Sequence, residues 1–172
     1  MKILVAGVGN VLWRDDGFGV EVAHRLQSMA FPPEVKVVET GIGGIHLVQE
    51  LLAGYDALIV IDAVDHGRPP GTLMVIIPDV EDVHQMPDAQ KYDYLADMHY
   101  TKPEKALMLA RALKILPKQL LMVGIQPVDT EAFERGLTAP VAAAVELAIA
   151  EVLRLVDEML SHPPSADGSP SA

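Results

Sequence analysis

The sequence contains no cysteine among its 172 residues. This absence excludes a disulfide framework, a zinc site built on thiolates and a cysteine nucleophile. A metal ion would have to be held by oxygen and imidazole ligands alone. No serine lies in the glycine-framed turn of a serine hydrolase either. Any hydrolytic chemistry must therefore proceed without a thiol and without such a serine.

Positive charge is sparse and dispersed. The chain has 13 Lys and Arg against 24 Asp and Glu, which gives a formal net charge of −11. Because no basic stripe exists, nucleic acid is not expected as a partner. An acidic surface favours a partner that carries basic segments.

Long apolar runs are also lacking. The longest runs, such as those at residues 57–61 and 73–77, fall far short of the roughly 18 residues of a membrane helix. The apolar N-terminal stretch contains two glycines and continues into Arg14, which is not the pattern of a signal peptide. We expect a cytoplasmic monomer with no membrane partner. Its single domain should span residues 1–161, followed by a disordered tail at 162–172, where proline and serine accumulate.

The residues that are present form strands and helices in alternation. Apolar runs predict strands at 2–7, 35–39, 55–61, 72–77 and 119–125. Helical spacing predicts helices from Gly17, at 45–52, after a capping box at 101–104, and from Thr138. The stretch 78–97 is polar and is expected to be a loop. This alternation indicates an α/β fold, with a mostly parallel sheet covered on both faces and a binding crevice at its carboxyl edge.

The first glycine loop invites comparison with a dinucleotide fingerprint. Gly7 and Gly9 fit that pattern, but Leu12 stands where its third glycine belongs. A bulky side chain there should prevent a close approach of the helix, and two acids follow where a pyrophosphate would lie. Nucleotide binding is therefore disfavoured.

Three polar residues fall on loops that should converge at the carboxyl edge. Asp16 lies between the first turn and the first helix, Asp62 follows a buried strand, and His99 precedes a helix start. Each also has a structural explanation. Asp16, like Asp15, could be a helix N-cap, Asp62 could bind loop amides, and His99 could be an exposed loop residue. Together, two carboxylates and one imidazole would suit a divalent ion with open coordination positions.

Other candidates carry a weaker signal. Asp65 and His66 lie near Asp62 within a turn. We expect them at most to hydrogen-bond to the residues that hold the metal. Trp13 and Phe18 could contact a partner, although core packing is the usual role of such residues. The remaining histidines fall on expected helices, on the polar loop or in the tail: His24, His46, His84 and His162.

Several blocks of the sequence resemble the hydrogenase maturation proteases. They are GVGNVLWRDDGFGV at 7–20, AGYDALIVIDAVD at 53–65, RPPGTL at 68–73, VGIQP at 123–127 and GLT at 136–138. The blocks occur in order and cover roughly residues 1–156. The resemblance implies a three-layer α/β/α fold around a five-stranded, mostly parallel sheet with one antiparallel strand. It also implies that Asp16, Asp62 and His99 contact metal and catalyse the reaction.

The resemblance further implies a substrate and a metal. The family removes a short C-terminal extension from the precursor of a nickel–iron hydrogenase large subunit, once nickel has been inserted. On this hypothesis the three residues grasp nickel that the precursor supplies, and no nucleotide takes part. The ion positions the scissile peptide and polarises its carbonyl or activates a water. A nickel-checking module that does not cut and an unrelated small metal-dependent hydrolase are the alternatives.

Two segments depart from the family pattern. The loop after the second expected strand has the sequence ETGIGG at 39–44, with Glu39 in place of aspartate and Ile42 in place of threonine. The segment DMHYT around His99 also differs from the commonest form. The first departure indicates either altered substrate selection or a divergent branch of the family, and the second bears on the role of His99.

Overall fold

The computed structural model describes residues 1–42, 44–83 and 103–162. Within this part of the chain, each of the five expected strands is present, with ends displaced by at most two residues. The strands are β1 (Ile3–Val8), β2 (Val35–Gly41), β3 (Ala57–Ala63), β4 (Leu73–Ile76) and β5 (Gln119–Ile125). The helices are α1 (Phe18–Gln27), α2 (Gly44–Leu51), α4 (Pro103–Ala112) and α5 (Ala139–Ser161), and a 3-10 turn η1 (Arg14–Gly17) precedes α1.

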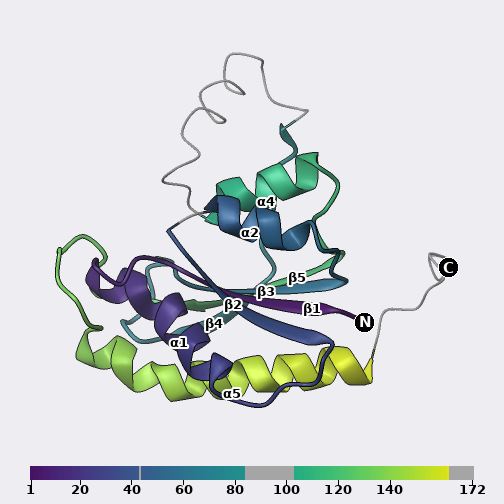
Figure 1. The fold of residues 1–172 in the computed structure, drawn as a ribbon. Coiled ribbons are helices and arrows are strands. Elements are labelled where there is room, and N and C mark those ends of the chain that lie inside the picture. Colours follow the sequence, from purple (N-terminus) through teal and green to yellow (C-terminus); the bar gives the residue numbers. More distant parts are fainter. Residues whose placement is uncertain (43, 84–102, 163–172) are drawn as a thin grey trace, which may run out of the picture.

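The five strands form one sheet in the order β2-β1-β3-β5-β4. β1, β2, β3 and β5 run parallel, and β4 pairs with β5 in the antiparallel sense. Figure 1 shows α1 and α5 on one face of this sheet and α2 and α4 on the other. The expected three-layer fold, with its single antiparallel strand, is thereby confirmed.

Each face of the sheet has its own apolar core. β1 divides its side chains between the two, with Ile3 and Val5 toward α1 and α5, and Leu4 and Ala6 toward α2 and α4. Burial on both faces explains why the central strands are continuous apolar runs. The apolar stripe expected on the last helix is also buried, at Val141, Val145, Ala148, Val152, Leu155 and Met159. In the expected polar loop, Val80 and Val83 are buried in the second core.

α1 approaches the sheet so closely that only glycine fits at the contact. A Cβ on Gly7 would lie 2.2 Å from the carbonyl oxygen of Gly19, and a Cβ on Gly19 would lie 2.1 Å from that of Ile61. The prediction that Leu12 prevents a close helix approach is therefore wrong. The close approach is made at Gly19, in the first turn of α1, because that residue and not residue 12 faces the strands.

The segments before α4 and after α5 lie largely outside the described residues. α4 begins at Pro103, with Glu104 in its first turn, so the Thr101 end of the expected capping box lies outside the described residues. α5 ends at Ser161, and the expected tail lies outside them except for His162. Among the described residues, no helix is both long and apolar enough to cross a membrane.

Candidate active site

A cleft opens where the chain reverses direction across the sheet. From β1 the chain moves outward to β2, and from β2 it crosses back over β1 to β3, so the loops after β1 and β3 diverge. Ligands bind at such switch points in open α/β sheets. Asp16, which follows β1, and Asp62, near the end of β3, both line this cleft, whose volume is about 780 Å³. Two of the three predicted site residues are thus brought to one place.

The turn after β1 positions Asp16. Gly9 has φ +130°, and a Cβ there would lie 1.8 Å from the main-chain oxygen of Asp16. The Asn10 amide donates to Oδ2 of Asp16 at 2.8 Å. The N-cap of α1 is Gly17, and no side chain caps the helix. The N-cap role considered for Asp15 and Asp16 is therefore wrong, because both residues lie inside η1.

Asp15 is fully buried and joins three segments of the chain. Its Oδ2 accepts hydrogen bonds from the amides of Val128 and Asp129 and from the hydroxyl of Thr138, at 2.9, 3.2 and 2.8 Å. Its Oδ1 accepts the Thr138 amide at 2.7 Å. The expected start of the last helix at Thr138 is thus correct, but the hydroxyl binds Asp15 in place of capping α5. Asp15 fixes the β5–α5 loop against η1.

Asp62 is 8% exposed and lies in β3 opposite Gly124 of β5. Its Oδ1 accepts the amide of Ala63 at 2.9 Å, so part of its hydrogen bonding is to the local main chain, as the structural alternative required. A purely structural role would not require Asp62 to line the cleft, and it does so.

Gln126, just after β5, organises the turn that carries Asp65 and His66. It is 5% exposed; its Oε1 accepts the amides of His66 and Arg68, and its Nε2 donates to Asp65 at 2.9 Å. The bonds from Gln126 and from the Gly67 amide hold the pKa of Asp65 below its usual value. Asp65 also lines the cleft. Sequence reasoning assigned no role to Gln126, because its partners lie about 60 residues away in the chain.

The cleft is strongly acidic. Among its described lining residues there are five carboxylates and no Lys, Arg or His: Asp16, Asp62, Asp65, Glu104 and Glu131. His99, the third predicted site residue, lies outside the described residues. Within residues 1–42, 44–83 and 103–162, no three His, Asp or Glu side chains gather in an arrangement that could hold a metal ion. The expected ligand set of Asp16, Asp62 and His99 therefore stays a prediction.

Trp13 and Phe18, both considered as partner contacts, have different positions. Phe18 is fully buried in the core beneath α1, as expected for a large apolar residue. Trp13 is 38% exposed and lines the cleft. Of the two, only Trp13 is placed to touch a substrate.

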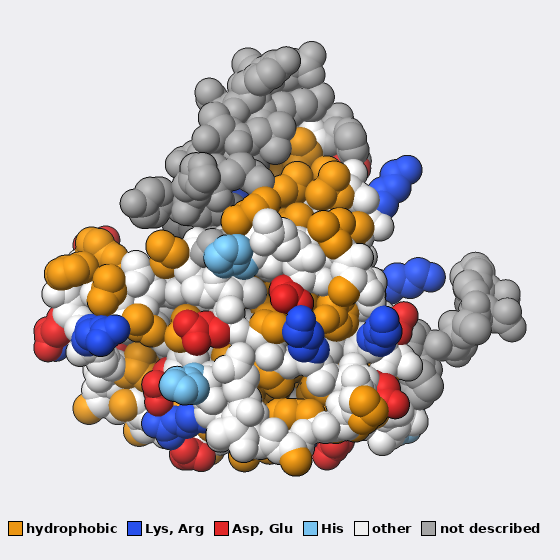
Figure 2. Space-filling model, in the orientation of Figure 1, with side chains coloured by type: hydrophobic (Ala, Val, Ile, Leu, Met, Phe, Trp, Pro, Cys, Tyr) orange, Lys and Arg blue, Asp and Glu red, His pale blue; other side chains and the backbone are white. Residues whose placement is uncertain are grey.

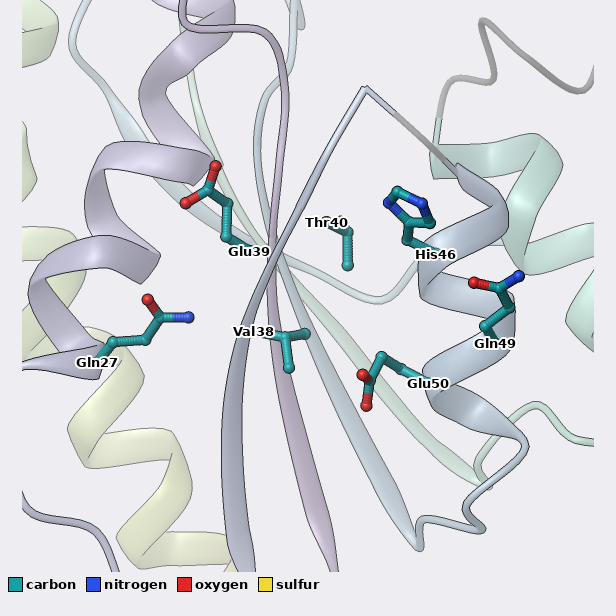
Figure 3. Close-up of a pocket in the computed structure, with 7 residues that line it drawn as sticks. All are labelled: Gln27, Val38, Glu39, Thr40, His46, Gln49 and Glu50. Atoms are coloured by element: carbon teal, nitrogen blue, oxygen red, sulfur yellow. The ribbon is translucent and has the colours of Figure 1, made fainter.

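The two unusual residues of the second glycine loop face different spaces. Ile42 lines the cleft with Asp16 and Asp62. Glu39 lines a second hollow of about 410 Å³ along β2, between α1 and α2. In Figure 3, Glu39 extends to the α1 side of β2, and Thr40 extends to the α2 side, toward His46. Thr40 is buried, and its hydroxyl donates to the carbonyl of Gly7 at 3.1 Å, which ties the end of β2 to β1.

Known proteins share this sequence and this fold. The model of the hydrogenase maturation protease family matches residues 20–155. A hydrogenase expression/formation protein, HupM, of Azotobacter chroococcum is 38% identical over 169 residues, covering 96% of this chain and 78% of that protein. A putative hydrogenase maturation protease of Methanocaldococcus jannaschii is 32% identical over 162 residues, covering 88% of this chain and 94% of the relative.

The solved structures agree with the sequence relatives. The hydrogenase maturating endopeptidase HybD of Escherichia coli superposes with a TM-score of 0.71 at 29% identity, covering 92% of this chain and 93% of HybD. Both the extent of the family match and the identity to relatives over nearly the whole domain exceed what a shared α/β fold alone would produce. The chain belongs to the hydrogenase maturation protease family.

Proposed function

We propose that this peptidase removes a short C-terminal extension from the precursor of a nickel–iron hydrogenase large subunit. The observation that carries the proposal is the meeting of Asp16 and Asp62 in one cleft at the switch point of the sheet. Membership of the maturation protease family supplies the reaction class. That membership also disfavours an unrelated small hydrolase.

Peptide hydrolysis joins a water oxygen to the scissile carbonyl carbon, breaks the C–N bond and delivers a proton to the departing amine. The chain has no thiol for this task. We assign the positioning of the scissile segment to Asp16 and Asp62, with His99 as their third partner. A carboxylate of the cleft could serve as the general base, which takes the proton of the attacking water.

We further propose that the precursor supplies nickel. The donor set fits this role, since it offers only three ligands, two of them hard carboxylates, and a site of that kind should hold nickel weakly without further donors. When bound, nickel would supply Lewis-acid polarisation of the scissile carbonyl. Asp16 and Asp62 would then bind nickel held by the precursor. A precursor without nickel would be rejected because it offers them no ion to bind.

The test is incubation with nickel-loaded and nickel-free precursor, followed by intact mass measurement. The expected result is loss of a C-terminal peptide from the loaded form alone. Asp62→Ala and His99→Ala should abolish this loss and change the free energy of unfolding by less than about 1 kcal/mol. Asp157→Ala, which removes an exposed carboxylate from α5, is the matched control and should cleave normally.

Two other outcomes would contradict parts of the proposal. A stable complex with no change of mass would show a nickel-checking module in place of a protease. The ownership of the metal is tested by treating the protein alone with a chelator, which is then removed. Activity should survive, and inactivation that is reversed by an added ion would show that the protein carries its own catalytic metal.

A further inference from the structure

Exposed apolar side chains gather beside the cleft. Half of the large apolar residues that are exposed in the described structure lie on loops at the carboxyl edge of the sheet: Val11, Leu12, Trp13, Ile42, Val128 and Phe133. Figure 2 shows hydrophobic side chains at the left of the view, over the β1–α1 turn and the β5–α5 loop. Concentrations of exposed apolar surface of this kind mark protein interaction sites.

This surface contains an aromatic pair. The rings of Trp13 and Phe133 meet edge to face, with centroids 5.7 Å apart and planes at 76°. Phe133 is 73% exposed, so most of this large apolar residue is accessible to solvent. Exposing such a ring is unfavourable in the free protein, and aromatic side chains are among the residues that contribute most when an interface buries them.

The aromatic pair is held in place by the surrounding chain. Trp13 forms a bridge with Glu134, and the Arg14 amide donates to the Glu134 carbonyl at 2.8 Å. The Arg14 guanidinium pairs with the Glu134 carboxylate, also at 2.8 Å. Arg14 adopts φ +45°, a conformation that non-glycine residues seldom occupy. The buried Asp15 joins the same two segments, η1 and the β5–α5 loop, by accepting the amides of Val128 and Thr138. A surface fixed in this way loses little conformational entropy on binding.

The surface is continuous with the cleft, and the two differ in chemistry. Trp13 belongs to both, because it contacts Phe133 and also lines the cleft. The cleft beside it is lined by five carboxylates and by no described cation. A segment that crosses from one to the other should therefore present apolar side chains to Trp13 and Phe133, and basic side chains to the cleft.

We infer that the Trp13–Phe133 pair is the docking surface for an apolar segment of the large-subunit precursor, next to the basic residues that enter the cleft. This inference rests on the proposed function for the identity of the partner. Docking at the pair would hold the precursor while its tail reaches Asp16 and Asp62. The pair would thus set the affinity for the precursor and leave the chemical step unchanged.

The experiment compares Phe133→Ser with Leu52→Ser. Leu52 is 65% exposed and follows α2 at the amino edge of the sheet, away from the cleft. Processing of the nickel-loaded precursor is followed by intact mass, and binding of the precursor is measured separately by biolayer interferometry. Phe133→Ser should raise both KM and Kd by about tenfold or more, with kcat within twofold of wild type. Phe133→Leu should restore most of the affinity, and Leu52→Ser should match wild type.

Each outcome decides one proposal. Equal KM and Kd for Phe133→Ser and Leu52→Ser would overturn the docking surface while cleavage by the wild type still supports the protease. If the wild type binds but does not cut, the proposed function fails, and the Kd of Phe133→Ser alone decides the docking surface. A change in the oligomeric state of Phe133→Ser without a change in Kd would assign the surface to a second copy of this chain. Thermal unfolding of each variant identifies any loss of affinity that comes from misfolding.

Discussion

The turns that follow β1 and β2 are both rich in glycine, yet they are built in different ways. In the first turn, Gly9 is packed against the main chain of Asp16, and Asp15 is buried among four hydrogen bonds. In the second, which begins at the last residue of β2, a Cβ on Gly41 would meet no atom within 4 Å, and Ile42 is 48% exposed. The first turn fixes the position of a carboxylate, and the second presents a side chain to the cleft. The two roles are distinguished by the packing around each turn and not by its glycine content.

The largest difference should appear when a methyl group is added to each turn. Gly9→Ala would place Cβ 1.8 Å from the Asp16 oxygen, at a φ of +130° that is nearly restricted to glycine. We expect a loss of at least about 4 kcal/mol in the free energy of unfolding. Gly41→Ala meets no atom within 4 Å and only suffers the left-handed φ of +56°, which costs about 1–2 kcal/mol. Chemical denaturation measures both, and equal losses would show that the two turns are equally constrained.

The next difference concerns the neighbouring carboxylates of the first turn. Asp15→Asn would turn an amide nitrogen toward donors that now converge on a carboxylate, and should cost about 2–4 kcal/mol. Asp16→Asn keeps an oxygen for the Asn10 amide and should cost less than about 1 kcal/mol. Processing should fall in both variants. Asp15→Asn loosens the β5–α5 loop, which contributes residues to the cleft wall, and Asp16→Asn removes a cleft carboxylate. If Asp16→Asn were the more destabilising change, Asp16 and not Asp15 would be the carboxylate that holds the turn in place.

The sequence predicted the strands well because the period and length of an apolar run are local properties. Asp62 was found for the same reason, since a carboxylate that directly follows a buried strand must lie at the edge of the sheet. That one strand runs antiparallel was implied by the family resemblance alone, and the structure identifies this strand as β4. Local patterns carry no information on whether a strand pairs parallel or antiparallel.

What the sequence could not give were the contacts between distant segments. Asp15 and Asp16 look alike in sequence, but the partners of Asp15 follow it by 113 to 123 residues. Gln126 was passed over because its partners precede it by about 60 residues. The close approach at Gly19 depends on where α1 lies on β1 and β3, which no motif of the first turn specifies. Such pairings arise from the fold, and single-sequence reasoning reaches them only through a family resemblance.

The smallest effect on stability, combined with a clear effect on function, is expected at Ile42. Ile42→Thr restores the residue that the family pattern predicts, at an exposed position that lines the cleft. Because no core contact is lost, the free energy of unfolding should change by less than about 0.5 kcal/mol. The exchange removes apolar surface from the cleft wall and adds a hydroxyl, so kcat/KM should change by about tenfold for at least one precursor.

Ile77→Thr is the matched control for this change, because Ile77 is 78% exposed and follows β4 at the opposite edge of the sheet. It makes the same chemical exchange away from the cleft and should leave kcat/KM unaltered. Processing of several nickel-loaded precursors, read by intact mass, separates selection from general activity. A change that differs between precursors would show that Ile42 selects the substrate, and a uniform change would show that it acts on the chemistry. Unchanged kinetics across all precursors would remove Ile42 from recognition, and the second turn would then be only a connection between β2 and α2.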